Sequence, residues 1–291
     1  MTDILSRGTV LNEEVKVICC RTTETVKEAA ERHKLSRSAA TALGRVLTMG
    51  SMMGSMLKSG KEKLEIMIDG KGPLGQIAVD GYFDASVRGF VQNPDVDDPK
   101  ASIGSLIGTN GYLRVVKDLG MKQPFVSEVD LQTGEIGDDF AYYYMLSEQT
   151  PSAISVGVGY DETGKLVSAG GLVFQLMPDA SEESIRIIEN IVANIKPISQ
   201  LMLEYDDPKE IIDAMFDDYQ ELGRQNPVFK CECSKARFAR VLSKLPADDL
   251  QTMIDEDNGC EVVCKFCGTK YQFSRETLEG YVTAQRAKKA S

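Results

Sequence analysis

Two pairs of closely spaced cysteines near the end of the chain constrain its fold more than any other feature. Cys231 and Cys233 lie in "VFKCECSKARF", and Cys264 and Cys267 lie in "EVVCKFCGTKYQFS". Structural zinc sites are tetrahedral, and thiolates are their preferred ligands. Gly268 directly follows the second pair and can adopt backbone angles that let both sulfurs face one ion. The spacing therefore predicts one zinc ion per chain, bound by Cys231, Cys233, Cys264 and Cys267.

The alternative is that these cysteines are small buried apolar residues. The total of seven cysteines is odd, which argues against a fully paired disulfide framework. The first residues show no signal peptide, and no apolar run approaches the roughly 20 residues of a membrane span. We therefore expect a cytoplasmic protein without a membrane partner. Thiols stay reduced there, and clustered cysteines in such proteins are typical of metal or redox sites.

The charge distribution suggests three parts. Residues 177–228 carry twelve acidic and four basic residues, a net charge of −8, whereas residues 229–291 carry nine and eleven, a net charge of +2. This change, together with Pro227, predicts a boundary near residue 229. We expect a core domain over 1–176, an acidic linker over 177–228 and a zinc-binding domain over 229–291. The net charge of −11 disfavours a nucleic-acid partner, because affinity for phosphates comes mostly from Lys and Arg.

The first part mixes helical and strand patterns. Helices are predicted over 22–35, 36–57 and 138–150 from their apolar periodicity. Short β-like runs separated by turn residues predict strands over 63–69, 75–80, 85–92, 112–119, 124–131, 153–160 and 166–177. Strands clustered together, with helices before and after them, predict an α+β fold around a mostly antiparallel sheet.

The acidic linker is predicted to contain two helices. The first covers 181–195 with Ser181 as its N-cap, and the second covers 208–222 with Asp207 as its N-cap before Pro208. One apolar stripe runs along the second helix and consists of Ile211, Ile212, Met215, Phe216 and Tyr219. A marginal helical segment with a stripe of this kind is a candidate two-state element.

The last 63 residues are predicted to form their own set of helices and strands. A helix capped by Ser234 should present Phe238, Val241, Leu242 and Leu245 on one face, and a second helix should end at Gly259. A strand, the Cys-containing turn, a second strand and a helix beginning at Ser274 should follow. A lobe of fewer than about 70 residues has little core, so bound metal is expected to hold it folded. Oxidation of the thiolates would then remove the ligands and unfold the lobe.

In these residues the chain resembles the heat shock protein 33 family of redox-regulated holdase chaperones. The resemblance rests on "CECS", on "EVVCKFCGTKYQF" and on "GGLVFQLMP" before the acidic region. It implies a stress-response protein that is inactive when reduced and zinc-bound. It also implies that oxidation forms the disulfides Cys264–Cys267 and then Cys231–Cys233, which releases zinc and unfolds the zinc domain and the linker. The oxidised homodimer would bind unfolding client proteins without ATP.

The resemblance implies no role for the other three cysteines. Cys19 and Cys20 lie in an apolar run, where buried structural roles are expected. Cys260 lies four residues before Cys264 and could divert a disulfide or provide a substitute ligand.

Three other features favour structural roles. "GKGPLG" at 70–75 matches a dinucleotide-binding pattern, but more strand follows it, which predicts a hairpin turn instead. Helical spacing of Met49, Met52, Met53 and Met56 predicts a core stripe, with a client-binding surface as the alternative. The single histidine, His33, is expected on the surface.

Two other functions compete with a chaperone. A zinc-ribbon nucleic-acid binder would need a strongly basic lobe, and a net charge of +2 gives weak support. A thiol oxidoreductase would place Cys-x-x-Cys at the start of a helix beside a βαβ unit, whereas here it lies between apparent strands. No nucleophile motif surrounds His33, so we expect no enzyme and assign no catalytic residue.

Overall fold

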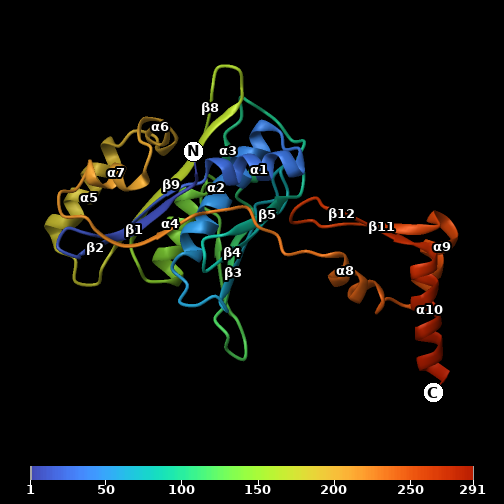
Figure 1. The fold of residues 1–291 in the computed structure, drawn as a ribbon. Helices are drawn as coiled ribbons and strands as arrows, with labels where there is room; N and C mark the ends of the chain where they lie inside the picture. Colours follow the sequence, from blue (N-terminus) through green and yellow to red (C-terminus); the bar gives the residue numbers. More distant parts are fainter. Residues whose placement is uncertain (1, 291) are drawn as a thin grey trace. The chain divides into compact units, whose positions relative to one another are not determined.

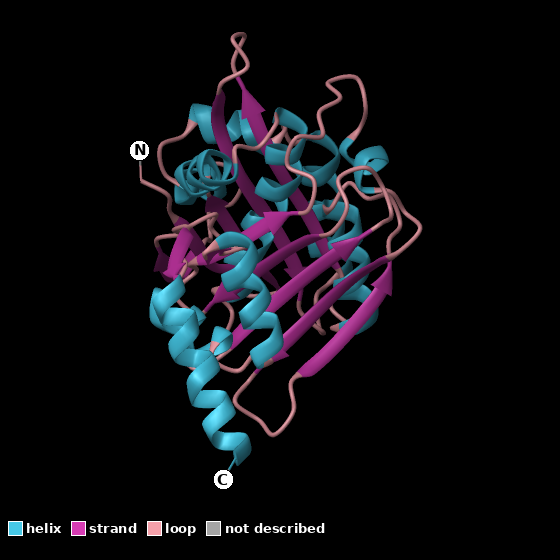
Figure 2. Ribbon diagram, turned by 90° about the vertical axis from the view of Figure 1, so that its right-hand side faces the viewer, coloured by secondary structure: helices cyan, strands magenta, loops and turns pink. Residues whose placement is uncertain are grey.

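The computed structural model describes residues 2–290, which form two compact units, Met1–Lys230 and Cys231–Ser291. The first unit contains two five-stranded sheets, and the second contains a two-stranded hairpin with three helices. Every paired strand in these sheets is antiparallel to its neighbours. The predicted α+β class with antiparallel sheets is confirmed (Figures 1 and 2).

Sheet A has the strand order β10-β1-β2-β9-β8. Its strands are β1 (Leu5–Val10), β2 (Val15–Arg21), β8 (Ser152–Tyr160), β9 (Leu166–Leu176) and β10 (Gln220–Gln225). Sheet B has the order β5-β4-β3-β6-β7. Its strands are β3 (Lys63–Asp69), β4 (Ile77–Tyr82), β5 (Val87–Val91), β6 (Tyr112–Asp118) and β7 (Phe125–Asp130).

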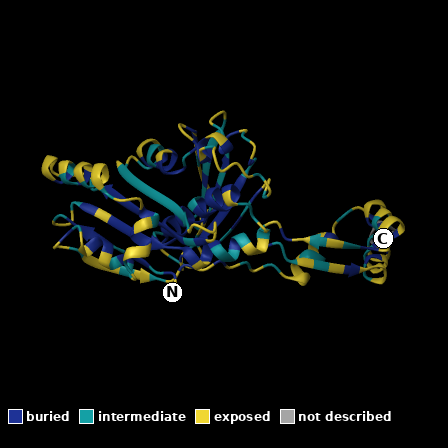
Figure 3. Ribbon diagram, turned by 90° about the horizontal axis from the view of Figure 1, so that it is seen from above, coloured by how far each residue is buried: buried dark blue, intermediate teal, exposed yellow. Residues whose placement is uncertain are grey.

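Helix α2 (Arg37–Gly54) contacts strands of both sheets and forms the centre of the first unit. From Ser38 to Ser55 only Arg45 is not buried. Figure 3 colours the chain by burial and shows buried residues gathered in the interior of the first unit. Gly50 allows close approach to sheet B, because a Cβ there would lie 2.7 Å from Val79 Cγ1. The helix is continuous, and Met49, Met52 and Met53 on it are buried, as the core prediction requires.

Three further helices lie in the first 176 residues: α1 (Thr23–His33), α3 (Ile103–Ile107) and α4 (Gly137–Ser147). The helices predicted over 22–35 and 138–150 are therefore confirmed. The "GKGPLG" segment connects the antiparallel strands β3 and β4, which confirms the hairpin and leaves no helix N-terminus for a dinucleotide. His33 is partly buried rather than a free surface residue, because its ring meets Phe229 edge to face at 6.4 Å.

Residues 177–228 pack within the first unit through α5 (Glu182–Asn194), α6 (Ile198–Glu204), α7 (Pro208–Asp213) and β10. Ser181 and Asp207 cap α5 and α7 as predicted. The predicted helix over 208–222 was wrong in its second half. It ends at Asp213, and residues 220–225 pair with β1 instead, because a partner strand more than 200 residues away overrides the local helical pattern.

The apolar stripe of this segment is part of a buried cluster on one face of sheet A. Ile211, Ile212 and Phe216 are buried against residues such as Val17 and Phe174. The Phe216 and Phe174 rings meet edge to face with centroids 5.8 Å apart. Helix α5 covers this face lightly, because only Ser184 and Ile188 on it are buried. Strands β1 and β2, which complete the face, were not predicted individually from the sequence.

The second unit contains α8 (Lys235–Leu242), α9 (Ala247–Asp257), β11 (Gly259–Val263), β12 (Lys270–Ser274) and α10 (Arg275–Ala290). Its small core consists of Leu242, Ala247, Leu250, Ile254, Phe273, Leu278 and Val282. Ser234 caps α8 by accepting from the Arg237 amide, as predicted. Val241 was wrongly placed on the apolar face and is 58% exposed. Asn258 has a left-handed backbone conformation and ends helix α9. Gly259, the predicted end of this helix, is instead the first residue of β11.

Candidate metal centre

The first cysteine pair lies in an extended segment before α8. Cys231 and Cys233 are two residues apart, and both are partly buried. Residues two apart in an extended chain point to the same side, so both sulfurs can face one point after a small bend. Ser234 then starts α8 and ends the extended segment.

The second pair lies in a tight turn between β11 and β12. The backbone amides of Cys267 and Gly268 both donate to the Cys264 carbonyl, at 3.3 and 2.8 Å. Gly268 has φ = +69°, the left-handed conformation that glycine adopts without a steric penalty. The Cys264 amide donates to the Thr269 carbonyl at 2.9 Å and closes the turn. Both thiols are buried and lie on the same side of the turn.

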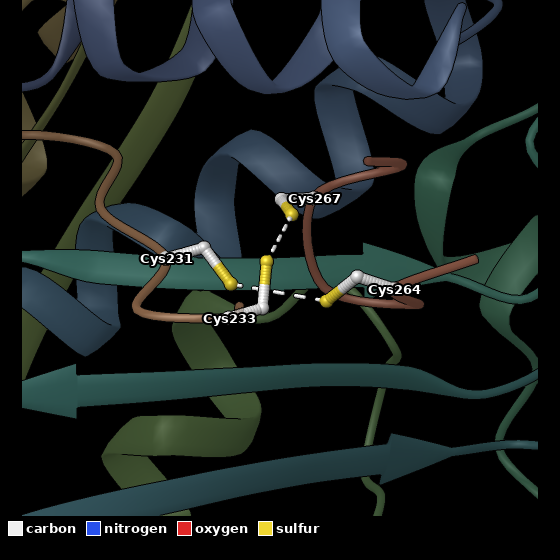
Figure 4. Close-up of side chains that lie close together, drawn as sticks. All are labelled: Cys231, Cys233, Cys264 and Cys267. Atoms are coloured by element: carbon white, nitrogen blue, oxygen red, sulfur yellow. Dashed lines mark hydrogen bonds between the residues drawn. The ribbon is translucent and has the colours of Figure 1, made fainter. Parts of the chain in front are cut away.

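The four thiols converge on one point (Figure 4). All four Sγ atoms lie within 4.8 Å of one another. The Sγ atoms of Cys231 and Cys264 are 3.8 Å apart, and those of Cys233 and Cys267 are 3.3 Å apart. A tetrahedral zinc ion with Zn–S distances of about 2.3 Å requires sulfur separations of about 3.8 Å. The donor set and its spacing therefore fit one such ion, and all seven cysteines in the described chain are free thiols.

Neighbouring hydroxyl groups make the four thiols chemically unequal. Burial raises the pKa of Cys264 to about 12. Burial also acts to raise the pKa of Cys267, but the Thr269 hydroxyl and amide and the adjacent thiols lower it to about 7. The Thr269 hydroxyl lies 3.2 Å from Cys267 Sγ. Cys267 therefore ionises more readily than Cys264 before a metal binds, and a bound cation favours the thiolate form of all four.

Tyr271 is a neighbour of the site that sequence reasoning missed. Its hydroxyl lies 3.1 Å from Cys233 Sγ, and this contact raises the pKa of Tyr271 to about 12. The Tyr271 ring also packs against Phe238 with centroids 5.2 Å apart. Tyr271 thereby connects the sulfur cluster to the small core of the second unit. Tyr271 follows Cys267 by four residues, and this short separation could have indicated that it lies near the site. The contact itself depends on the register of β12, which the sequence does not reveal.

The other three cysteines lie outside the cluster. Cys19 and Cys20 are completely buried in β2, as their apolar surroundings predicted. Cys260 is partly buried in β11, opposite Phe273, and packs against the second unit's core. The four clustered cysteines are the group of potential metal ligands found within the described residues.

Comparisons with known proteins cover nearly the whole chain. A family model described as "Hsp33 protein" matches residues 3–274, which include both cysteine pairs. Proteins named 33 kDa chaperonin from Bacillus cereus (strain B4264) and Bacillus anthracis (strain A0248) are each 40% identical over 289 residues, covering 97% of this chain and 99% of theirs. The crystal structure of a 33 kDa chaperonin (heat shock protein 33 homolog) from Thermotoga maritima is similar, with a TM-score of 0.91 and 35% identity. That match covers 98% of this chain and 99% of the other.

Proposed function

The chain belongs to the Hsp33 family, and on this premise we propose that it is a redox-regulated, ATP-independent holdase chaperone. Its reduced form binds one zinc ion and is inactive. Its oxidised form releases zinc, forms homodimers and binds unfolding client proteins in the cytoplasm. We assign it no catalytic residue. Within residues 2–290, no helix has both the length and the apolar content needed to cross a membrane.

The convergence of four free thiols carries this proposal. Zinc fits them better than a harder cation, because thiolates are soft ligands and no carboxylate or histidine belongs to the cluster. In this assignment Cys231, Cys233, Cys264 and Cys267 are the ligands, and zinc would neutralise their thiolate charge. The ion would also hold together two chain segments that are more than 30 residues apart.

Oxidation converts the ligand set into disulfides, Cys264–Cys267 first and Cys231–Cys233 second. For each pair, hydrogen peroxide accepts two electrons and two protons and leaves as two water molecules, while the S–S bond forms. In the zinc-bound form all four thiols would be held as thiolates, which is the form that peroxide oxidises. The sulfur contacts of 3.8 and 3.3 Å join one cysteine of each pair, so bonding within a pair would move the sulfurs out of these contacts.

The small core of the second unit explains why it would depend on metal. Seven residues form its buried cluster, in a unit of about 60 residues, which is a size at which metals or disulfides commonly supply the missing stability. Loss of four ligand bonds removes a free energy comparable with the folding free energy of such a unit. Unfolding of this unit on oxidation is the expected consequence.

The last three residues of the first unit, Val228–Lys230, pair with β5 of the same unit, and we name them the strap. The Val87 amide on β5 donates to the Val228 carbonyl at 2.9 Å, and the Lys230 amide donates to the Val87 carbonyl at 2.8 Å. Phe229 between them is buried, and the Arg32 guanidinium lies over its ring at 5.6 Å. Unfolding that begins at Cys231 would therefore act first on the strap and then on residues 177–228.

Residues 177–228 are suited to release because of their charge. Each of the four basic residues, Arg186, Lys196, Lys209 and Arg224, forms an ion pair with an acidic residue of the same segment. These pairs occupy five of the twelve acidic residues, since Arg224 contacts both Asp207 and Glu221. The remaining negative charges repel one another and oppose re-docking of the segment. Release would expose the stripe of Ile211, Ile212 and Phe216 for client binding.

The rival functions find less support. The Cys-x-x-Cys pair lies in a turn between β11 and β12 and not at a helix N-terminus, which disfavours a thiol oxidoreductase. The weakly basic second unit disfavours a nucleic-acid binder.

Zinc content and client aggregation, each measured before and after peroxide treatment, test the proposal. A chelating dye should detect one zinc ion per reduced chain and its release on oxidation. Light scattering of a thermally unfolding enzyme should fall only in the presence of the oxidised protein, without ATP. Equal suppression of aggregation by both forms, or retention of zinc after oxidation, would overturn the redox switch.

A further inference from the structure

A groove lies in the first unit where α2 ends at Gly54. A cavity of about 490 Å³ lies among the end of α2, β6 and α4, and a second cavity of about 190 Å³ continues along sheet A. The two cavities share Lys16, Met56 and Gln175 and are therefore neighbours, and the groove is the larger of the two. Ligand-binding clefts have similar volumes of about 300–1,000 Å³.

The apolar wall of the groove includes the end of the methionine stripe. Met53 and Leu57 are buried, whereas Met56 and Leu119 are partly exposed to the groove. Flexible methionine side chains adapt to apolar partners of different shape. The stripe is therefore mainly core, but its last turn lines a cavity that apolar side chains can enter.

The rim of the groove has an excess of positive charge. Glu148 is neutralised by an ion pair with Lys117, and Glu62 accepts a hydrogen bond from the Lys58 amide at 2.8 Å. Lys16 and Lys58 are exposed, and their amino groups have no carboxylate partner among the described residues. The groove can therefore accept an acidic group next to an apolar one.

Tyr144, one of the residues that line the groove, has a buried hydroxyl group that bears on the kind of ligand. Tyr144 lines the larger cavity and is 3% exposed, and its hydroxyl has no hydrogen-bond partner in the part of the chain that is described. A buried hydroxyl without a partner is destabilising, and a ligand acceptor that reached it would relieve this cost. A peptide backbone supplies carbonyl acceptors along its length, whereas an acyl chain supplies none at the depth of its tail.

We propose that this groove binds short extended segments of client proteins in which apolar and acidic residues alternate. The inference rests on the proposed holdase function and specifies the client sequences that it favours. Apolar client side chains would contact Met53, Met56 and Leu57. Acidic side chains would pair with Lys16 and Lys58, and a backbone carbonyl would accept from Tyr144.

The groove lies entirely within the first unit and is present before oxidation. We expect the binding of one short segment to be too weak to prevent aggregation. Holding an unfolded client requires the second apolar surface, which residues 177–228 would supply after release. Two linked sites then bind one chain far more tightly than either site alone.

Peptide binding to the reduced, zinc-loaded full-length protein tests this inference. The probe is a fluorescein-labelled peptide of alternating Leu and Asp, compared by anisotropy with a peptide of alternating Leu and Lys. We expect the acidic peptide to bind about tenfold more tightly. The double variant K16E/K58E should lose about tenfold affinity for it. Tyr144→Phe, which keeps the ring, should lose about fivefold. K165E, which changes an exposed lysine in the β8–β9 turn, is the matched control and should bind normally.

The position of binding can be read from methionine methyl NMR signals. The methyl signal of Met56 is identified by its absence from the spectrum of the Met56→Leu variant. The acidic peptide should shift this signal. No peptide binding, equal binding by all variants, or binding of oleate in place of the peptide would overturn the inference. These outcomes leave zinc release and oxidative activation untouched, so they are distinguishable from failure of the holdase function itself.

Discussion

Cys264 and Cys260 are four residues apart but have different surroundings. Cys264 Sγ lies 3.8 Å from Cys231 Sγ within the cluster, whereas Cys260 packs against the core of the second unit. We predict that Cys264→Ser lowers zinc affinity about a hundredfold, because four ligands share an apparent binding free energy of about 10–16 kcal/mol. Competition with a chromophoric chelator measures the change. Undiminished affinity would mean that Cys260 substitutes as a ligand.

Cys260→Ser is the matched control for that variant and a prediction of its own. A site with four sulfur ligands has no open position, so zinc affinity and peroxide activation should stay within about twofold of the unmodified protein. Both are measured by the zinc and aggregation assays above. Loss of activation with normal zinc binding would place Cys260 in the disulfide chemistry.

At this scale the sequence predicted which cysteines converge, because short spacing and a following glycine are local signals. Gly268 has the predicted left-handed backbone conformation. The contacts of Tyr271 and the unequal pKa values of Cys264 and Cys267 could not be predicted. They depend on strand register and burial, which arise only after the chain folds.

At the scale of elements, the strap is the contact whose removal is most informative. Phe229 is 7% exposed, and its truncation to Ala should cost about 3 kcal/mol of docking free energy. We predict that F229A activates faster in peroxide while binding zinc normally in the reduced state. The Val87 amide should also lose hydrogen-exchange protection. Val228→Ala is the matched control, because Val228 is 46% exposed and its carbonyl still accepts from Val87. Equal activation rates in both variants would mean that the strap does not restrain the switch.

The elements also show where local patterns suffice. Strands from β3 to β9 and helices α1, α2, α4 and α5 were predicted, because each has its own periodicity and turn residues. The first three residues of β10 were predicted as helix, because the residues that determine the strand's conformation lie in β1 at the start of the chain. Helix α6 is short and lies between two prolines, and no pattern in the sequence indicated it.

At the scale of the whole molecule, the acidic segment 177–228 packs within the first unit and precedes the second unit, which we propose to depend on metal. The segment carries a net charge of −8 and covers part of sheet A with few buried residues on α5. The remaining part of the first unit has a large core around α2 that contains no element of the switch. Oxidation should therefore unfold the chain from its C-terminal unit to residue 177 and leave residues before 177 folded.

Hydrogen exchange of reduced and peroxide-treated protein, compared segment by segment, tests this central claim most directly. The account predicts that residues 177–228 and 231–290 lose protection on oxidation, whereas α2 and strands β3 to β9 keep theirs. Equal protection of residues 177–228 in both states, in a sample with full oxidant-activated holdase activity, would contradict the account, because client binding would then not need release of these residues.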